Sequence, residues 1–447
     1  MMASSSLHAT ACIACRRRGR KCDRTLPTCL ACEKRGVACE GYVTKWPGVA
    51  ARGKLAGKSI PVVNSSASIT ESHTQLTRAQ QRKGKPPPAS QSNFTDEEID
   101  KFVQHYIADL SSIFYLGSGP SENPMFHYVL PLISTIAPIR FALAGSASCH
   151  IAARTSDTAL ELKSLRLRVH ATHLLREKLQ TPGGVSDQSV LASILMLAQL
   201  DMCSGDCTEF ETHLKAAVAV IRGPVYDGEV NQYYFEQRLA WLDVMSSTTS
   251  QKPPNLTMEE VETIIGRFSS NGQRQWSYDV FPCPIDLFQI ITEVTFLFKI
   301  QPEEVKSRIQ DLGRRLNEWK PPLMTGARKH MVEAWKLGIK AYLHRLFPDI
   351  QNEESLSEQV LALAELIPPA SSWSYALLWP IFQVAVTLGD ENIEEKNLIR
   401  RRLKIALETI GCRHHSNALE VLEAVWAKEE EFDRFSISIP GRTIMLV

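Results

Sequence analysis

Six cysteines near the N-terminus repeat one spacing, and this spacing constrains the fold more than any other feature of the chain. They form the pattern C-x2-C-x6-C-x6-C-x2-C-x6-C, at Cys12, Cys15, Cys22, Cys29, Cys32 and Cys39. Zinc takes four tetrahedral ligands, and a C-x2-C pair places two thiolates on one ion with little loss of chain entropy. Two zincs need eight ligand positions, so six cysteines suffice only if two thiolates are shared. The segment is short and poor in apolar residues, and we therefore expect it to fold only around metal.

Disulfide bonds and a ring-type zinc site both fit the six cysteines less well. A disulfide framework requires an oxidising compartment, but residues 1–11 contain no apolar signal segment, and the chain has no apolar run long enough to span a membrane. We therefore expect an intracellular chain with no membrane partner, in which paired C-x2-C motifs indicate metal. A ring-type ubiquitin ligase has longer gaps and usually a histidine ligand, and residues 12–39 contain no histidine.

Charge is distributed unevenly along the chain. Residues 1–95 carry 16 Lys and Arg against 4 Asp and Glu, whereas residues 96–447 carry 34 against 45, so that the total is only +1. Six thiolates and two Zn2+ ions sum to a net negative charge, which the surrounding basic residues overcompensate. This basic head predicts binding to nucleic acid, with an affinity that falls steeply with salt.

The cysteine spacing, the basic run over residues 16–21 and Pro27 before the fourth cysteine together resemble the fungal zinc binuclear cluster family of transcription factors. The resemblance implies two Zn2+ ions bridged by the first and fourth cysteines, Cys12 and Cys29. It assigns the remaining cysteines in pairs, Cys15 and Cys22 to one ion, Cys32 and Cys39 to the other.

The same resemblance implies how the module reads double-stranded DNA. A short helix after Cys15 enters the major groove at a short GC-rich, CGG-like site. The family's usual base-reading lysine is replaced by Gly19, so Arg18 and Arg20 are the candidates to contact guanine, which arginine binds bidentately. The DNA motif itself stays open. The expected DNA contacts are Arg16, Arg17, Arg18, Arg20, Lys21, Lys34 and Arg35.

Residues 43–94 have the composition of a disordered basic linker. Large apolar residues are few, polar residues and lysine are frequent, and prolines occupy positions 86–88. No sustained heptad repeat follows the cysteines, so a coiled-coil dimer is not predicted and the oligomeric state stays open. The basic runs 16–21 and 82–85 are candidate nuclear localisation signals, although the second is equally compatible with plain linker charge.

From residue 95 onward the pattern changes to helical periodicity. The sequence Thr95-Asp-Glu-Glu98 predicts a capping box, with the Thr95 hydroxyl on the Glu98 amide and the Glu98 carboxylate reaching back. There is little period-2 alternation, and we predict an all-α domain large enough for a substantial core. Apolar residues recur at helical spacing over 99–110, 190–198, 210–221, 398–407 and 418–426.

This helical part resembles the regulatory domain that accompanies the zinc cluster in one branch of the fungal family. The resemblance rests on residues 189–222, 238–244 and 373–380 and on their order along the chain. It implies a domain that receives the transcription machinery or co-regulators, and a small-molecule effector is a further candidate ligand. The predicted organisation is a zinc-cluster DNA-binding module over 8–42, the linker over 43–94, a large all-helical regulatory domain over 95–435 and a C-terminal tail over 436–447.

No arrangement of residues in the helical part predicts catalysis. Walker loops and dinucleotide fingerprints are absent from the sequence. Several pairs of cysteines and histidines lack a third ligand or a carboxylate at recognisable spacing, and we predict buried thiols and core or surface histidines. These pairs are Cys149 and His150, His170 and His173, Cys203 and Cys207, and His414 and His415, the last placed in an inter-helix loop. Trp241, Trp373 and Trp379 are expected to pack in the core, and the chain is predicted not to be an enzyme.

The sequence therefore predicts a nuclear, zinc-dependent, sequence-specific DNA-binding regulator of RNA polymerase II transcription. The alternative is a zinc-stabilised interaction scaffold whose basic head binds RNA or acidic partners. The acidic segment 429–433 fits an activating segment and a helix end with a solvated tail equally well. The target genes, the pathway and the choice between activation and repression stay open.

Overall fold

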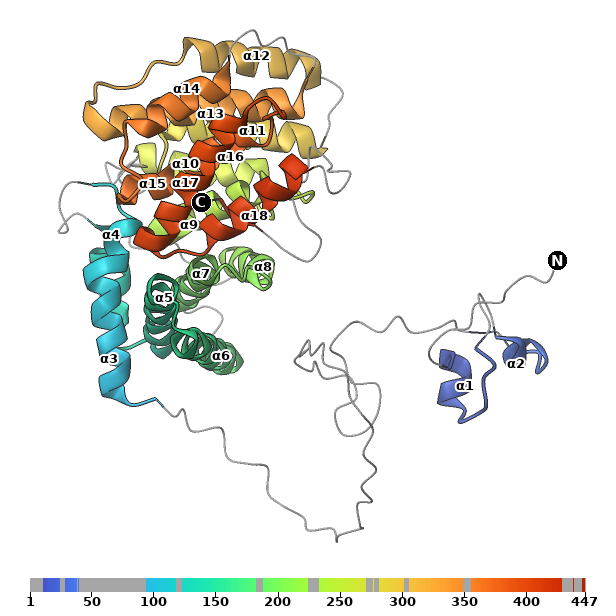
Figure 1. Ribbon diagram of the computed structural model, residues 1–447. Helices are drawn as coiled ribbons and strands as arrows, with labels where there is room; N and C mark the ends of the chain where they lie inside the picture. The colour runs from blue at the N-terminus through green and yellow to red at the C-terminus, as the bar shows by residue number, and fades with distance from the viewer. Residues whose placement is uncertain are drawn as a thin grey trace. The chain divides into compact units, whose positions relative to one another are not determined.

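Helices make all the regular secondary structure in the described part of the chain, which confirms the predicted all-α class. The computed structural model forms two compact units, a head unit within Met1–Pro87 and a helical unit within Pro88–Val447 (Figure 1). The residues that the structure describes are 11–24, 29–37, 39, 94–117, 123–181, 188–223, 233–270, 276, 281–300, 305–348, 355–427, 437 and 444–446. The linker prediction for 43–94 lies almost wholly outside these residues.

The head unit contains two short helices, α1 (Ile13–Arg17) and α2 (Leu30–Glu33). The helical unit begins with α3 (Asp96–His105), which continues through the π-helical η2 (Tyr106–Leu110) into α4 (Ser111–Ile113), and then η4 (Met125–Val129) and η5 (Leu130–Leu132). Longer helices follow: α5 (Ala137–Thr155), α6 (Thr158–Gln180), α7 (Gln188–Ser204), α8 (Phe210–Ile221), α9 (Tyr233–Ser247), α10 (Met258–Ser270) and α11 (Ile285–Ile300). The last are α12 (Val305–Glu318), α13 (Gly326–Leu346), α14 (Leu356–Glu365), α15 (Ser372–Ala376), α16 (Leu378–Ala385), α17 (Ile393–Ile410) and α18 (His414–Ala427).

The N-terminus of α3 follows the predicted capping box in one of its two halves. The Thr95 hydroxyl accepts a hydrogen bond from the Glu98 amide at 3.2 Å. The Glu98 carboxylate contacts the ammonium group of Lys163 on α6. The cap therefore starts the helix as expected, and Glu98 ties it to a neighbouring helix.

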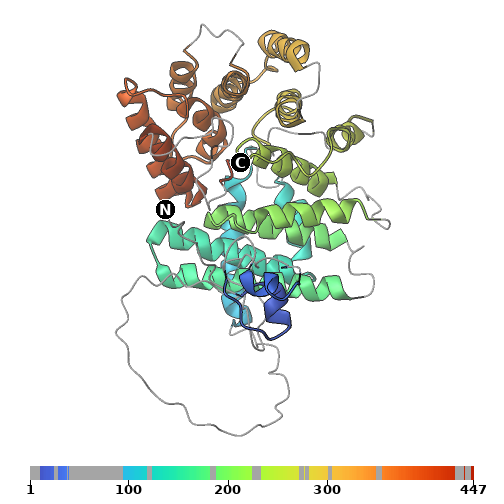
Figure 2. The same ribbon diagram turned by 90° about the vertical axis from the view of Figure 1, so that its right-hand side faces the viewer.

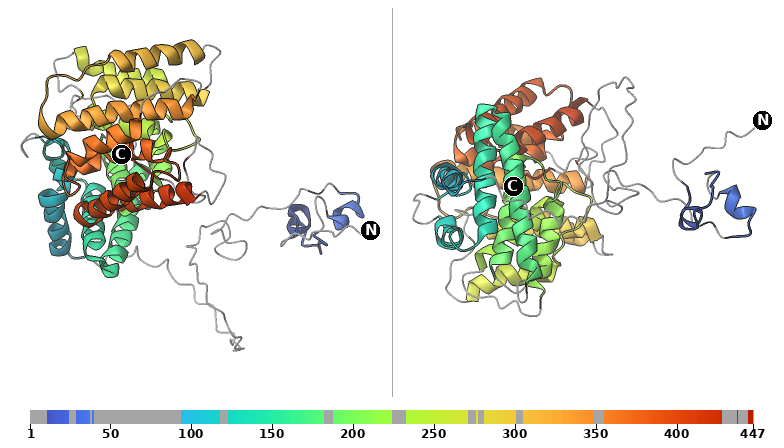
Figure 3. Two further views of the ribbon diagram at one scale, coloured as in Figure 1. Left: turned by 45° about the horizontal axis from the view of Figure 1, so that its top comes forward. Right: turned by 90° about the horizontal axis from the view of Figure 1, so that it is seen from below.

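Helix α7 is the centre of the helical unit. Every residue from Ser189 to Cys203 is buried, so the segment predicted as one apolar stripe is covered on all sides. The antiparallel pair α5 and α6 packs against α7, and α8 packs against it as well (Figure 1 and Figure 2), while helices α11 to α14 stack at the far end of the unit (Figure 3). A helix that is hydrophobic all round requires such a surrounding shell.

A buried polar cluster fixes the turn between α7 and α8. Asp201 on α7 is fully buried, and its carboxylate contacts Arg168 of α6 at 3.2 Å and His213 Nδ1 of α8 at 2.9 Å. Arg168 also pairs with Asp206 in the turn, at 2.7 Å. A buried charge needs such partners. Three consecutive elements are thereby held in one orientation.

The turn between α7 and α8 packs against the turn between α17 and α18. Gly205 has a φ of +72°, and a Cβ atom there would lie 2.9 Å from Asn417 Nδ2. Asn417 donates to the Gly205 carbonyl at 2.6 Å, and the Arg413 amide donates to the Cys203 carbonyl at 3.1 Å. Glycine is required here by both the left-handed backbone and the close approach of α18.

The prediction that His414 and His415 lie in an inter-helix loop is wrong. The loop is formed earlier, because α17 ends on Gly411 at φ +74°, and His414 is the first residue of α18. Both histidines are buried, and His415 Nδ1 lies 3.1 Å from the Cys412 carbonyl. They pack edge-on against Tyr375, so they belong to the core.

Aromatic side chains fill the core between α9, α11, α13 and α16. Trp241 and Trp379 are buried, and Trp335 stacks on Trp379 with ring centroids 5.0 Å apart. These contacts confirm that Trp241 and Trp379 pack in the core, as predicted. Trp373 is only partly buried and lies against the guanidinium of Arg328.

The segment predicted as a C-terminal tail returns to the helical unit where the structure describes it. Ile437 and the run Ile444 to Leu446 are buried in the hydrophobic core, and the Ile444 carbonyl accepts a hydrogen bond from Thr249 at 3.2 Å. The acidic segment 429–433 lies outside the described residues.

No single helix in the described ranges is long and apolar enough to cross a membrane. Met125–Leu132 and Ala137–Thr155 reach that length only as a pair that is bent by 117°.

Buried neutral histidines predict that acid destabilises the helical unit. Burial lowers the pKa of His415 from 6.5 to about 4. Protonation therefore favours the unfolded chain, so the stability that the neutral histidine preserves is present above pH 6.5 and is lost as the pH falls toward 4. The loss for this group is on the order of 3 kcal/mol.

We expect the free energy of unfolding of the full chain, followed by urea titration of the helical circular dichroism, to fall between pH 6.5 and 4.5. His415→Gln should make this pH dependence shallower. The exposed His173, changed to Gln, is the matched control and should leave it intact. An equally steep fall in the His415→Gln protein would contradict the assignment.

Candidate metal centre and nucleic-acid interface

The two halves of the cysteine repeat fold in the same way. In each half the first cysteine accepts a hydrogen bond at its sulfur from the amide of the second, Cys15 to Cys12 and Cys32 to Cys29, both at 3.3 Å. A short helix begins directly after the first cysteine, and in the second half Cys29 is its N-cap. A thiolate that accepts amide hydrogen bonds at a helix N-terminus is stabilised as an anion.

Glycines at the same position end both helices. Gly19 and Gly36 have φ values of +61° and +60°. The residue after each glycine donates its amide back to the second cysteine of the half, Arg20 to Cys15 at 2.9 Å and Val37 to Cys32 at 3.1 Å. This is the Schellman arrangement, which needs a left-handed residue and favours glycine. Gly19, which departs from the family's usual lysine, therefore serves the same backbone turn as Gly36.

Four sulfurs gather at the centre of the head unit. The Sγ atom of Cys12 lies 3.6 Å from that of Cys29 and 3.7 Å from that of Cys32. The Sγ atom of Cys15 lies 3.8 Å from that of Cys29 and 3.6 Å from that of Cys32. Zinc–sulfur bonds of about 2.3 Å in a tetrahedron give sulfur–sulfur edges of about 3.8 Å. The spacing of these four sulfurs therefore suits tetrahedral zinc.

The remaining two cysteines pack against this group. Cys22 and Cys39 are partly buried against the cluster, and Cys22 Sγ accepts a hydrogen bond from the Cys12 amide at 3.4 Å. Cys29 belongs both to the group of four and to a second group with Cys22 and the Asp23 carboxylate. A cysteine shared by two groups is what a bridging ligand requires.

The structure also places Cys15 and Cys32 side by side, at 3.6 Å, although the resemblance assigns them to different zincs. The division of the six cysteines between the two ions therefore stays a prediction.

Close packing of the cysteine sulfurs suits a site that binds a cation. Burial raises the pKa of Cys12 and Cys29, and the hydrogen bond with Cys29 raises the pKa of Cys32. Thiolates this close repel one another, whereas zinc binds the deprotonated form. Divalent metal resolves the conflict, because its charge offsets those of its ligands.

Asp23 joins the two halves, a role that we did not predict from the sequence. Its carboxylate accepts hydrogen bonds from the amides of Leu30, at 3.0 Å, and Ala31, at 2.6 Å. These are the first amides of α2, so a residue of the first half caps the helix of the second. The only sequence signal was an aspartate directly after the third cysteine.

Basic side chains surround the cysteines on the outside of the head unit. The exposed ones among the predicted DNA contacts are Arg17, Arg18, Arg20, Lys21, Lys34 and Arg35, whereas the Arg16 side chain lies outside the described residues. Arg35 also approaches the Cys15 sulfur, with Nη1 at 4.0 Å. Its charge therefore lies beside a cysteine sulfur as well as at the surface.

Most of the other cysteines and histidines singled out in the sequence are buried in packing contacts. Cys149 donates to the Cys203 carbonyl at 3.5 Å, and Cys207 donates to the Asp201 carbonyl at 3.8 Å. Both are buried and burial raises the pKa of each, which describes inert structural thiols. His150 is buried beside His105, whereas His173 is exposed.

A six-cysteine metal centre in a basic head, joined to a large helical unit, defines a zinc-dependent DNA-binding transcription factor. Comparison with protein families agrees. Residues 10–46 match the fungal Zn(2)-Cys(6) binuclear cluster domain, and residues 101–436 match the fungal specific transcription factor domain. The chain therefore belongs to the fungal zinc binuclear cluster transcription factors, and its cluster domain binds two zinc ions. Both matched domains are transcription factor domains and neither is an enzyme family.

No curated protein and no solved structure was found to match the chain.

The cap formed by Asp23 predicts a measurable effect on zinc binding. Asp23→Ala removes two hydrogen bonds from the start of α2, at a cost of about 1–2 kcal/mol. Because folding and metal binding of such a module are coupled, the affinity for zinc should fall by roughly 5- to 30-fold. Competition with a chelator of known affinity measures it in the full chain. Asp23→Asn, which keeps an acceptor oxygen, should lose less, and equal zinc affinity in all three proteins would rule out the cap.

Proposed function

We propose that this protein is a nuclear regulator of RNA polymerase II transcription whose zinc-folded head reads a short GC-rich, CGG-like site in the major groove. The observation that carries the proposal is the gathering of cysteine sulfurs at 3.6–3.8 Å beneath exposed basic side chains. Two zincs fold the head, with Cys12 and Cys29 as the bridging ligands. The helical unit then connects DNA binding to co-regulators or the transcription machinery.

The arginines on either side of Gly19 contact the bases. Gly19 has no side chain to reach a base, and its conformation ends α1. Arg18 and Arg20 flank it and are exposed, so their guanidinium groups are available to guanine in the major groove. Arginine reads guanine bidentately, which supports a site containing G·C pairs.

The basic residues farther from this turn contact the phosphates. Arg16, Arg17 and Lys21 belong to the first half, and Lys34 and Arg35 lie in the turn that follows α2. Contacts of this kind position a protein on the duplex and carry no sequence information. Because the two halves repeat, the second set presents positive charge in the same backbone setting as the first.

A basic head attached to an acidic helical part supports this division of labour. The net charge of residues 96–447 repels a phosphate backbone, so DNA affinity is concentrated in the head. The helical part is left free to interact with other molecules.

Selection from random duplex DNA by the full chain, at near-physiological salt, tests the proposal. We expect enrichment of a short G·C-containing motif that requires zinc and disappears with a chelator. Zinc-dependent binding without enrichment would instead support a scaffold that binds nucleic acid indifferently.

One arginine variant and one lysine variant distinguish base recognition from phosphate contact. Arg18→Ala should relax base preference at one position of the selected motif, costing about 1–3 kcal/mol there. Lys34→Ala should weaken binding to all sequences and reduce the salt slope by about 1. Arg314→Ala, on the exposed surface of α12, is the control and should change neither. Equal effects of the two head variants on preference and salt dependence would contradict the assigned roles.

A further inference from the structure

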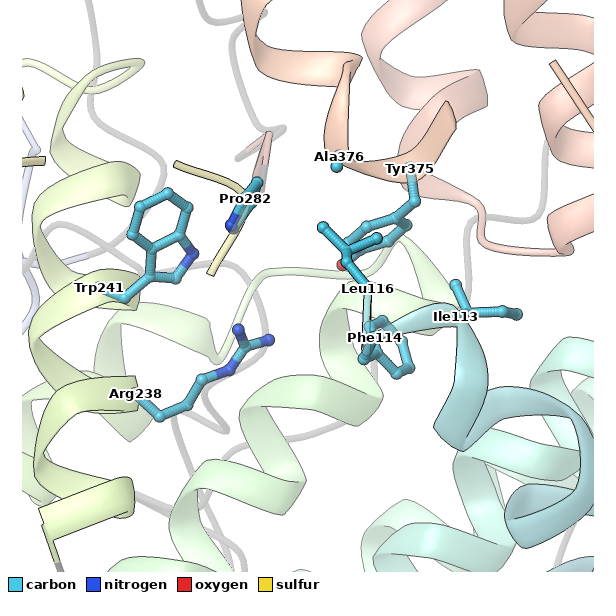
Figure 4. Close-up of a pocket in the computed structure, with 8 residues that line it drawn as sticks. All are labelled: Ile113, Phe114, Leu116, Arg238, Trp241, Pro282, Tyr375 and Ala376. Atoms are coloured by element: carbon cyan, nitrogen blue, oxygen red, sulfur yellow. The ribbon is translucent and has the colours of Figure 1, made fainter. Parts of the chain in front are cut away.

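A small cavity in the helical unit is lined by hydrogen-bond donors from distant parts of the chain. Its polar side chains are Arg238 and Trp241 on α9 and Tyr375 on α15, and its apolar walls include Ile113, Phe114 and Pro282. The guanidinium of Arg238, the nitrogen edge of Trp241 and the hydroxyl of Tyr375 face the same space (Figure 4).

Two of these donors are buried without a partner. Trp241 is fully buried and Tyr375 is 6% exposed. Neither the indole Nε1 nor the phenol oxygen has a hydrogen-bond partner among the described residues. A buried donor that is left unpaired costs free energy, so such groups normally have a ligand, an ion or water beside them.

The third donor supplies a positive charge. Arg238 is half-buried, and the described residues offer it neither a hydrogen bond nor an ion pair, although other half-buried arginines of the unit, such as Arg168 and Arg413, pair with carboxylates. No acidic side chain among the described residues lines the cavity. Burial raises the pKa of Tyr375 well above its usual value, so the phenol stays protonated and donates. The cavity therefore offers three hydrogen-bond donors, one of them positively charged, and no carboxylate. Such a set of groups is suited to binding an anion.

The size and surroundings of the cavity define the part of a ligand that it receives. Its volume of about 20 Å³ suits a small polar group only. Leu116 lines this cavity and also an open groove of about 500 Å³, whose walls mix apolar with polar side chains: Leu323, Met324, Thr325, Ala327, Arg328 and Trp373. Arg328 holds the backbone here by donating to the Leu116 carbonyl at 3.1 Å. A ligand with a charged head and an apolar body would therefore span both compartments.

We propose that this site binds a small organic acid, with its carboxylate held by Arg238, Trp241 and Tyr375 and its apolar body extending past Leu116 over Trp373. Apolar walls with a few convergent polar groups are typical of small-molecule sites. The inference builds on the proposed function, because it identifies an effector site on the helical unit of the regulator. Segments 238–244 and 373–380, which the sequence singled out, meet at this site.

Binding of matched acids and amides to the full-length, zinc-loaded protein tests the site without DNA. The probes are hexanoate, benzoate and phenylacetate, each compared with its neutral amide by calorimetric titration. At least one acid should bind about tenfold or more tightly than its amide, because the charge-assisted contacts depend on the carboxylate. Absence of any preference for the acid across the three pairs would overturn the proposal, and would leave a cavity that holds only water.

Variants locate the binding. Arg238→Gln removes the positive charge. The affinity for the preferred acid should fall by about tenfold or more, whereas the affinity for its amide should change little. Tyr375→Phe keeps the ring but removes the hydroxyl, and the affinity for the same acid should fall by a few-fold. This variant provides a second measure if Arg238→Gln disturbs folding. Arg314→Gln, on the exposed surface of α12, is the control with the same change of charge. Equal acid affinity in the wild-type, Arg238→Gln and Tyr375→Phe proteins would also overturn the proposal.

Failure of this site and failure of the DNA-binding proposal are separable. The titrations contain no DNA and the duplex selection contains no organic acid, so each result stands by itself. Loss of acid binding with intact motif selection would remove the effector site alone.

Discussion

Attraction between zinc and closely packed thiolates is the interaction on which the head unit depends. The cysteine sulfurs approach to 3.6–3.8 Å, where thiolates repel unless a divalent cation lies among them. Little else in the segment favours folding, because its buried residues are mainly the cysteines themselves. Helix starts at the C-x2-C pairs, helix ends at two glycines and the Asp23 cap then orient the exposed basic side chains. Metal binding and presentation of positive charge are thereby one event.

The helical unit is stabilised in a different way, by burial around a central helix. Helix α7 is enclosed on all sides, and the Asp201 cluster fixes its exit toward α8. The corner at Gly205 then receives α18. This arrangement brings α9 and α15 close together around the small cavity, although they are far apart in the chain. A ligand at that point would contact several elements of the unit at once, which is the physical requirement for an effector to change its conformation.

Much of the fold and of the metal centre was predictable because both depend on local patterns. The cysteine spacing predicted the zinc cluster, and helical periodicity predicted the all-α unit and the positions of α7, α8 and α17. Features that depend on long-range packing were not predictable. Asp23 caps a helix in the other half of the head, and His414 and His415 are buried because Gly411 ends α17 before them. The unpartnered donors of Trp241 and Tyr375 come together only through tertiary folding. Residues 444–446 are buried because the chain returns to the core there.

The number of zinc ions per chain tests the shared-ligand cluster most directly. Native mass spectrometry of the full protein measures it, with Cys29→Ala compared with Cys39→Ala. We expect two ions in the wild-type protein, about one in Cys39→Ala and none held stably in Cys29→Ala, because a bridging thiolate serves both metals. Duplex DNA binding should be lost together with the metal. A Cys29→Ala protein that retains two zincs and binds DNA would contradict the shared-ligand cluster.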